Sequence, residues 1–228
     1  MLDSLKQRVF KANLDLVRHG LVIHTWGNVS GKDPATGLIV IKPSGVSYDT
    51  MKEEDMVVMD ADGKVVEGRF KPSTDAPTHI ILYKEFGMIG GVVHTHSTYA
   101  TSWAQSGRAI PAFGTTHADH YHGEVPCTRI LTDQEIYTDY EINTGRVIVE
   151  SFGKIDPMAV PSALVHSHGP FCWGEDPEKA VYNAIALEEI ARMAFNTVML
   201  ERTEQVEQSL LDKHFKRKHG RDAYYGQK

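Results

Sequence analysis

Apolar and polar residues alternate along the chain with two different periods, which predict a mixture of helices and strands. Within residues 2–19, apolar side chains recur at the spacing of one helical face, at Leu2, Leu5, Val9, Leu14 and Val17. Short apolar runs predict strands at 38–41, 56–59, 64–67, 92–96, 146–150 and 164–168. Further helices are predicted from about 75 to 86, from 99 to 106, from 176 onward and from about 204.

Length and charge narrow the class of protein. The 228 residues contain no internal repeat and no linker, so we expect one domain of α/β or α+β type over 1–228. The net charge of −6, with no basic stripe before the C-terminal end, argues against nucleic-acid binding. No apolar run approaches the ~20 residues that cross a bilayer, and the start lacks the layout of a signal peptide. Because only two cysteines occur, we expect a cytoplasmic protein without a disulfide scaffold.

Two histidine pairs are the first candidates for chemistry. His94 and His96 end an apolar run, and alternate residues of a strand share a face, so their rings could bind one metal ion. A second run, 163–169, contains His166 and His168 at the same spacing. A lone histidine is usually a core or surface residue. Two pairs carried on predicted strands favour a metal site.

Two polar turns suggest an anion site. Lys42, Ser44 and Gly45 follow a predicted buried strand, where backbone N–H groups and a cation can surround a phosphate. Residues 71–75 precede a predicted helix, whose N-terminus also attracts anions. Each turn alone could be an ordinary turn or a helix cap. Their occurrence together favours a phosphate site.

Other polar residues leave alternatives open. Residues 25–30 could form a hairpin with a core tryptophan, or a Gly-Asn turn that presents Asn28 to a ligand. Asp119 lies in a histidine-rich loop, 111–123, as either a turn residue or a proton-transfer group. The polar and aromatic end of the chain, 223–228, could fray or dock against a neighbouring subunit.

Eight segments, in order, resemble one protein family. They are Thr-Trp-Gly-Asn-Val-Ser (25–30), Ile-Lys-Pro-Ser-Gly-Val (41–46), Lys-Pro-Ser-Thr-Asp (71–75), Val-His-Thr-His-Ser (93–97), Gly-Thr-Thr-His-Ala-Asp (114–119), Val-His-Ser-His-Gly-Pro-Phe (165–171), Lys-His-Gly (218–220) and Ala-Tyr-Tyr-Gly-Gln (223–227). Together they resemble the class II aldolase/adducin superfamily and, within it, the L-ribulose-5-phosphate 4-epimerases. Each motif is weak alone, but eight in order across the whole chain are specific.

The resemblance implies a fold and an assembly. The fold would be a three-layer α/β/α arrangement around a central, mainly antiparallel sheet. The assembly would be a fourfold-symmetric homotetramer with active sites between adjacent subunits, which requires a contact that closes on itself. The C-terminal tail, about 212–228, would complete the active site of a neighbouring subunit.

The resemblance also implies the roles of individual residues. Asp75, His94, His96 and His168 would bind one zinc ion per subunit, although such ligands also accept Mn²⁺ or Co²⁺. His166 would be structural or would support the ligands. The phosphate of the sugar would bind among Gly27, Asn28, Lys42, Ser44, Gly45, Ser73 and Thr74. Asp119 and, from a neighbouring subunit, Tyr225 would transfer protons, and His214 would reach the interface with that subunit.

The implied reaction interconverts L-ribulose 5-phosphate and D-xylulose 5-phosphate. Direct removal of the C4 hydrogen is difficult because no carbonyl activates it, whereas retro-aldol cleavage between C3 and C4 followed by re-addition avoids this step. A class II aldolase acting on L-fuculose 1-phosphate is the nearest alternative, but that family places a glutamate base where this chain has Asp75. A metal-free adducin-like interaction module and a zinc hydrolase are further alternatives.

Three positions depart from the family pattern. Thr74 stands where a second serine is common and keeps the hydroxyl group. His120 and His122 stand where aromatic residues are usual, so they could change the surroundings of Asp119.

Overall fold

The structure is a computed structural model that describes residues 2–201, 204–221 and 223–226. The strands are β1 Gly27–Lys32, β2 Ile39–Ile41, β3 Val57–Met59, β4 Val65–Glu67, β5 Gly91–Thr95, β6 Ser162–Val165 and β7 Gly169–Gly174. The helices are α1 Asp3–Arg18, α2 Ala76–Glu85, α3 Thr98–Gln105, α4 Thr115–Ala118, α5 Asp133–Tyr137, α6 Tyr140–Phe152, α7 Pro177–Met199 and α8 Gln208–His219, with a short 3-10 helix, η1, at Glu53–Asp55.

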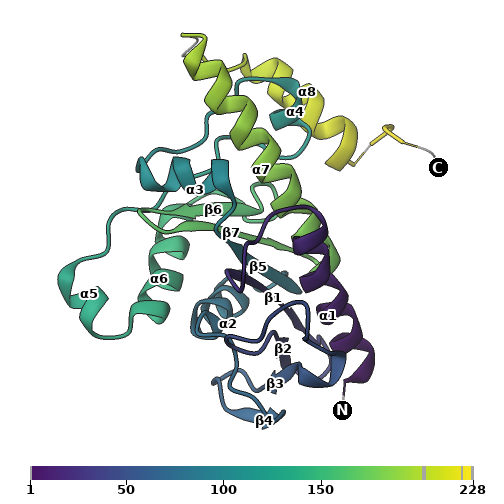
Figure 1. Cartoon of the computed structure of the whole chain (residues 1–228). Coiled ribbons are helices and arrows are strands. Elements are labelled where there is room, and N and C mark those ends of the chain that lie inside the picture. Colours follow the sequence, from purple (N-terminus) through teal and green to yellow (C-terminus); the bar gives the residue numbers. More distant parts are fainter. Residues whose placement is uncertain (1, 202–203, 222, 227–228) are drawn as a thin grey trace.

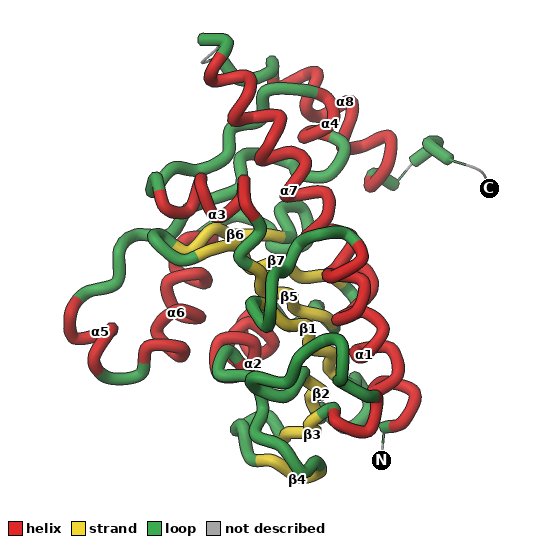
Figure 2. Tube along the Cα trace, in the orientation of Figure 1, coloured by secondary structure: helices red, strands yellow, loops and turns green. Residues whose placement is uncertain are grey.

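One seven-stranded sheet forms the middle layer, in the order β4-β3-β2-β1-β5-β7-β6. Every neighbouring pair of strands is antiparallel. Helices α1 and α7 lie along one face, and α2 and α6 lie on the other (Figures 1 and 2). The predicted α/β/α arrangement with an antiparallel sheet is therefore confirmed. In the described part of the chain, every helix is too short or too polar to span a membrane.

Glycine allows α7 to approach the sheet closely. A side chain at Gly91 would collide with the backbone at Asp176 and Pro177, where α7 begins. Asp176 caps this helix, because its carboxylate accepts a hydrogen bond from the Lys179 amide at 2.7 Å. The strand that carries His94 is consequently packed between α7 and the opposite helical layer.

One predicted strand is wrong. Residues 146–150, which contain three β-branched residues in a row, lie within helix α6. Thr144, Val147, Ile148 and Phe152 are buried at spacings of three and four, so they form one helical face. This face packs on α2, and the gain from tertiary packing outweighs the strand propensity of valine and isoleucine.

The structure also differs from the prediction at the second histidine pair and at Asn28. Strand β6 ends at Val165, and residues 166–168 form a turn in which Ser167 has a φ of 62°. The second histidine pair is therefore not carried on a strand as predicted, and the next strand, β7, was not predicted. Asn28 lies inside β1, opposite His94, rather than in a turn. A hairpin turn at 27–28 is therefore wrong.

Candidate metal and phosphate site

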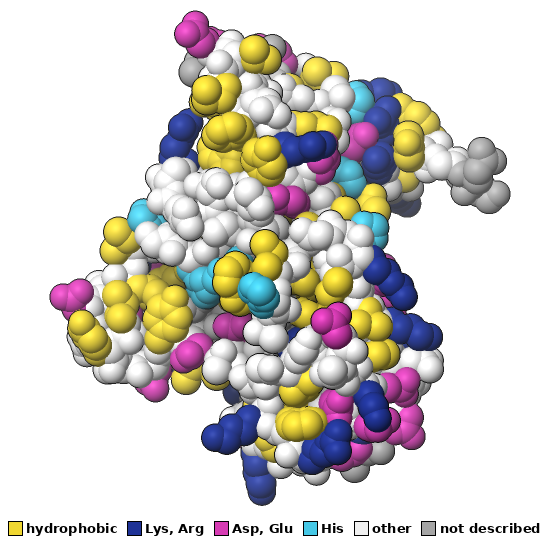
Figure 3. Space-filling view, viewed as in Figure 1, with side chains coloured by type: hydrophobic (Ala, Val, Ile, Leu, Met, Phe, Trp, Pro, Cys, Tyr) yellow, Lys and Arg dark blue, Asp and Glu magenta, His cyan; other side chains and the backbone are white. Residues whose placement is uncertain are grey.

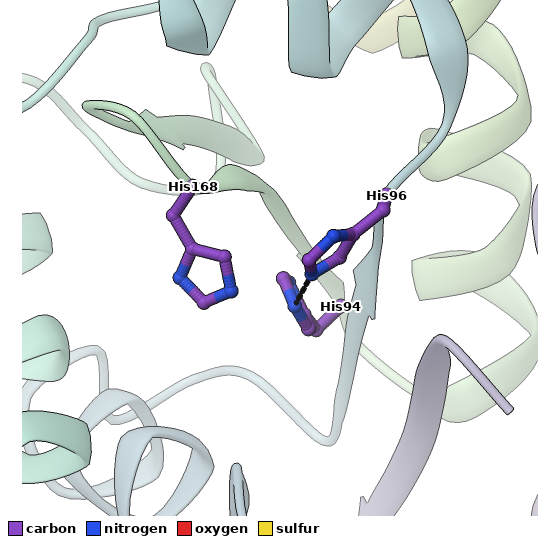
Figure 4. Close-up of side chains that lie close together, drawn as sticks. All are labelled: His94, His96 and His168. Carbon is purple, nitrogen blue, oxygen red and sulfur yellow. Dashed lines mark hydrogen bonds between the residues drawn. The ribbon is translucent and has the colours of Figure 1, made fainter.

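Three histidines from separate segments meet at one end of the sheet. His94 is in β5, His96 follows the end of that strand, and His168 comes from the turn between β6 and β7. Their available ring nitrogens all lie within 4.8 Å of one another (Figure 4). The Nε2 atoms of His94 and His96 are 3.0 Å apart. Imidazoles that converge in this way could hold a metal ion.

The protonation of these rings suits a metal ligand. Nδ1 of His94 lies 3.0 Å from the carbonyl oxygen of Pro170, which accepts its hydrogen and leaves a lone pair on Nε2. Burial lowers the pKa of His94 and His96, and burial with the two neighbouring rings lowers the pKa of His168 to about 3. All three are therefore neutral at pH 7, the form in which histidine binds metals.

Asp75 lies beside the histidines but is turned toward β1. It occupies the N-cap position of α2, yet its side chain makes no capping hydrogen bond. Its Oδ2 atom instead accepts a hydrogen bond of 2.6 Å from the Asn28 amide. Burial raises the pKa of Asp75, but His94, His79 and this hydrogen bond more than offset it, so the carboxyl group is ionised. Within the described residues, the group of converging ligand atoms comprises the three histidines without Asp75.

These residues border one polar cavity of about 340 Å³. Its lining consists of Thr25, Trp26, Gly27, Asn28, Lys42, Pro43, Ser44, Gly45, Ser73, Thr74, Asp75, His94, His96 and His168. Every residue predicted to bind the metal ion or the phosphate is in this set. Thr25, Trp26 and Pro43 were not predicted. Figure 3 shows histidine side chains in the middle of one face of the molecule.

The two polar turns lie side by side. The Ser44 amide donates to the Lys71 carbonyl, and the Ser73 amide donates to the Lys42 carbonyl, both at 3.0 Å. The sequence places these turns 29 residues apart, and this backbone pairing joins them at the cavity. The two turns, each of which could have been an ordinary turn or a helix cap, thus form one surface that carries backbone N–H groups and side-chain hydroxyl groups.

Lys42 is a buried cation in this surface. Only 2% of its surface is exposed, and its ammonium group donates to the Val46 carbonyl at 2.8 Å and lies 4.8 Å from the centre of the Tyr48 ring. Among the described residues no carboxylate forms an ion pair with it. Burial lowers the pKa of Lys42 to about 8. A buried lysine without a carboxylate partner is well suited to an anionic ligand.

The remaining predicted site residues form a second cluster. Asp119 follows α4, and its carboxylate contacts His214 at 3.0 Å, Arg217 at 2.7 Å and Lys218 at 3.3 Å, all on α8. Burial raises the pKa of Asp119, but the three partners lower it by more than burial raises it, and the net result is a pKa of about 2. Tyr225 places its ring 5.1 Å from the Arg217 guanidinium. The structure therefore brings Asp119, His214 and Tyr225 together.

This second cluster is separate from the cavity. None of its residues lines the cavity, and α4 and α8 lie beside α7, away from β1, β2 and α2 (Figure 1). Basic side chains gather over the region of α8 (Figure 3). Residues 222, 227 and 228 of the predicted tail lie outside the described residues, whereas Tyr225 is described and 62% exposed.

Arg217 and Lys218 were missed by the sequence interpretation, which treated them as part of a basic tail. Their signal was available, because His214, Arg217 and Lys218 have the i, i+3, i+4 spacing of one helical face. His122 also supports α8, since it lies 2.8 Å from the Asp212 carboxylate. His166 is outside the cavity, with its ring packed against Gly107.

Comparison with known proteins finds a family, a relative of similar sequence and solved structures of similar fold. A family described as Class II Aldolase and Adducin N-terminal domain matches residues 7–195. A protein of Salmonella paratyphi B named L-ribulose-5-phosphate 4-epimerase UlaF is 56% identical over 228 residues, all of both chains. A solved structure of an L-fuculose 1-phosphate aldolase has a TM-score of 0.79 and 26% identity, covering 92% of this chain and 94% of that one. The fold of YgbL from Escherichia coli is also similar, with a TM-score of 0.74 at 22% identity, covering 92% of this chain and 97% of that one.

Proposed function

Because the chain belongs to the class II aldolase and adducin family, we propose that it is an L-ribulose-5-phosphate 4-epimerase. It would interconvert L-ribulose 5-phosphate and D-xylulose 5-phosphate. The observation that carries the proposal is the meeting of three histidines and two phosphate-type turns in one cavity. The 56% sequence identity, over the full length of both chains, to a relative of that name supports the choice of substrate.

The phosphate of the substrate would bind between the two turns. The amides of Ser44 and Ser73 already donate to backbone carbonyls. Among the described residues, the amides of Gly45 and Thr74 have no acceptor, so they are free to donate to a phosphate oxygen. Lys42 would supply the positive charge. The phosphate would thus fix one end of the sugar in the cavity.

The metal site would consist of His94, His96 and His168, with Asp75 as a carboxylate ligand. A bound divalent ion, zinc in this proposal, would stabilise the negative charge that develops on the C2 and C3 oxygens during cleavage between C3 and C4. The neutral state of the three rings and the ionised state of Asp75 support this ligand set. The chain's part is to hold the sugar oxygens and the phosphate at the two ends of one polar cavity.

Proton transfer would use the second cluster. Cleavage removes the proton from the C4 hydroxyl, and re-addition to the opposite face of the aldehyde returns a proton from the other side. Two groups are therefore needed, and we assign them to Asp119 and Tyr225. Because both lie away from the cavity of their own chain, they would act on the cavity of an adjacent subunit in a fourfold homotetramer, with His214 beside them.

The proposal is tested by giving the zinc-loaded protein L-ribulose 5-phosphate or L-fuculose 1-phosphate in separate reactions. Epimerase activity predicts D-xylulose 5-phosphate from the first and no cleavage of the second. Two neighbouring histidines provide a matched pair of variants. His168→Asn should lose both zinc and activity, whereas His166→Asn, which changes a residue outside the cavity, should keep both. Cleavage of L-fuculose 1-phosphate alone would favour the aldolase alternative.

A further inference from the structure

A fully buried histidine on α2 has no part in the function proposed above. His79 is 0% exposed, and its Nε2 atom is buried without a hydrogen-bond partner in the described part of the chain. Buried polar groups in folded proteins are nearly all hydrogen-bonded. A buried ring nitrogen without a partner therefore needs an explanation.

His79 is the middle member of a row of polar side chains. Asp75, His79 and Tyr83 follow one another at four-residue spacing, so they lie on one face of α2. The row faces β1, where Asn28 and Ser30 share one side of the strand. Asn28 bonds to Asp75 at 2.6 Å. Ser30 Oγ lies 2.7 Å from Nδ1 of His79 and 2.8 Å from the Tyr83 hydroxyl.

The contacts of this row allow one continuous chain of donors. Burial raises the pKa of Tyr83, so its hydroxyl keeps a proton that it can donate to Ser30 Oγ. Ser30 can in turn donate its own hydrogen to Nδ1 of His79. Burial also lowers the pKa of His79 to about 3, so the ring is neutral and has one N–H. In this chain of donors that N–H is on Nε2, the nitrogen without a partner.

The His79 side chain interacts electrostatically with two proposed metal ligands, Asp75 and His94. The backbone N–H of His79 donates to the Asp75 carbonyl at 3.1 Å. The His79 ring contacts Phe171 edge-on, with centres 6.0 Å apart, and Phe171 stacks on His94 at 4.2 Å. Asn28 and Ser73 both reach a single oxygen of Asp75, Oδ2. A carboxylate offers about four acceptor positions, so Asp75 can accept a further hydrogen bond while it binds a cation.

We propose that His79 is a positioning residue whose Nε2–H donates to the Asp75 carboxylate when Asp75 binds the metal ion. The inference rests on the metal site of the proposed function. Tyr83 and Ser30 hold the imidazole in the tautomer that can donate, and His79 holds the carboxylate toward the histidines. Partners of this kind orient metal ligands and are important for affinity.

The experiment measures Co²⁺ binding by the metal-free full-length protein against a competing chelator. His79→Phe removes both ring nitrogens and should weaken Co²⁺ binding by about 10-fold or more. His79→Gln, which carries an amide near the position of Nε2, should retain most of the affinity. The control is His117→Phe, because His117 is also buried, at 4% exposure, but lies on α4 outside the cavity. It should bind Co²⁺ as the wild type does.

A second measurement needs no substitution. Nitrogen-15 NMR of the wild-type protein reports which ring nitrogen of His79 is protonated, and the proposal requires Nε2–H. A proton on Nδ1, or a folded His79→Phe variant with unchanged Co²⁺ affinity, would overturn the role of His79. A wild-type protein that bound no Co²⁺ would instead contradict the metal site itself, and the inference with it.

Discussion

The side-chain amide of Asn28 donates a 2.6 Å hydrogen bond to the carboxylate of Asp75. Asn28 also lies directly opposite His94 in the ladder between β1 and β5. One residue of β1 is thus fixed against two of the proposed metal ligands. Asp75 makes this bond instead of capping α2, so the helix gives up a stabilising contact worth about 1 kcal/mol. Such a loss is expected where a side chain serves a site rather than the fold.

The first prediction concerns this bond. Asn28→Ala removes the donor, and Asp75 becomes free to turn away from the histidines. We expect the affinity for Zn²⁺ to fall by about 10-fold or more, measured by competition with a chelating dye. Asn196→Ala is a suitable control because Asn196 is exposed on α7. Unchanged affinity in Asn28→Ala would show that the hydrogen bond does not orient Asp75.

The second prediction is a pH dependence of phosphate binding. Burial lowers the pKa of Lys42 to about 8, and only the charged form attracts an anion. In metal-free protein, the affinity for inorganic phosphate should therefore fall as the pH rises above about 8, by up to ~10-fold per unit. Because a bound anion favours the charged form, the pKa of Lys42 should be higher in the complex.

Two variants separate Lys42 from other groups that titrate. Lys42→Met should bind phosphate weakly at pH 7.5 and lose the decline between pH 8 and 10. Lys64→Met, at an exposed position in the β3–β4 turn, should behave as the wild type does. Calorimetric titration checks both. An identical pH profile in Lys42→Met would assign the decline to another residue.

The third prediction concerns stability next to His96. The Glu188 carboxylate on α7 accepts hydrogen bonds from the amides of Tyr99 and Ala100, at 2.8 and 2.9 Å, in the first turn of α3. Glu188→Ala leaves these amides without an acceptor and should lower the free energy of unfolding by about 2 kcal/mol in urea. Glu189→Ala breaks only an exposed ion pair with Arg192 and should change it by less than about 0.5 kcal/mol. Equal effects would contradict this role of Glu188.

The fourth prediction tests whether the active site is shared between subunits. His94→Asn and Asp119→Asn should each reduce turnover by about 10²-fold or more, and Asp119→Asn should keep its zinc. Refolding the two variants together would create some interfaces with both native residues. In a random mixture of a cyclic assembly, about a quarter of the sites should then be active. A mixture as inactive as its components would mean that both residues serve one subunit.

Much of this architecture could be predicted from the sequence. The pattern of the residues predicted α1, α3 and α7, and short apolar runs predicted β2, β3, β4 and β5. The His94-x-His96 pair and the two polar turns, chosen as candidate metal and phosphate sites, do line one cavity, and each was found because its signal depends on adjacent residues. The resemblance to a family chose His168 over His166 within the second histidine pair and added Asp75 as a ligand.

Two of the errors depend on contacts between distant segments, and one depends on a local backbone turn. Helix α6 contains a strand-like run, and only its packing against α2 makes the helix favourable. Local alternation placed both His166 and His168 on a strand, whereas the left-handed conformation of Ser167 turns the chain between them. Arg217 was missed as a partner of Asp119 because 98 residues separate the two in the chain.

The most direct test of the proposed activity is ¹³C NMR of L-ribulose 5-phosphate labelled at C4, incubated with the zinc-loaded protein. We expect the C4 signal of D-xylulose 5-phosphate to appear, to be lost after chelation of the metal and to return when zinc is restored. Net accumulation of glycolaldehyde phosphate would indicate an aldolase with another substrate. An unchanged spectrum from protein with bound zinc would contradict the epimerase assignment.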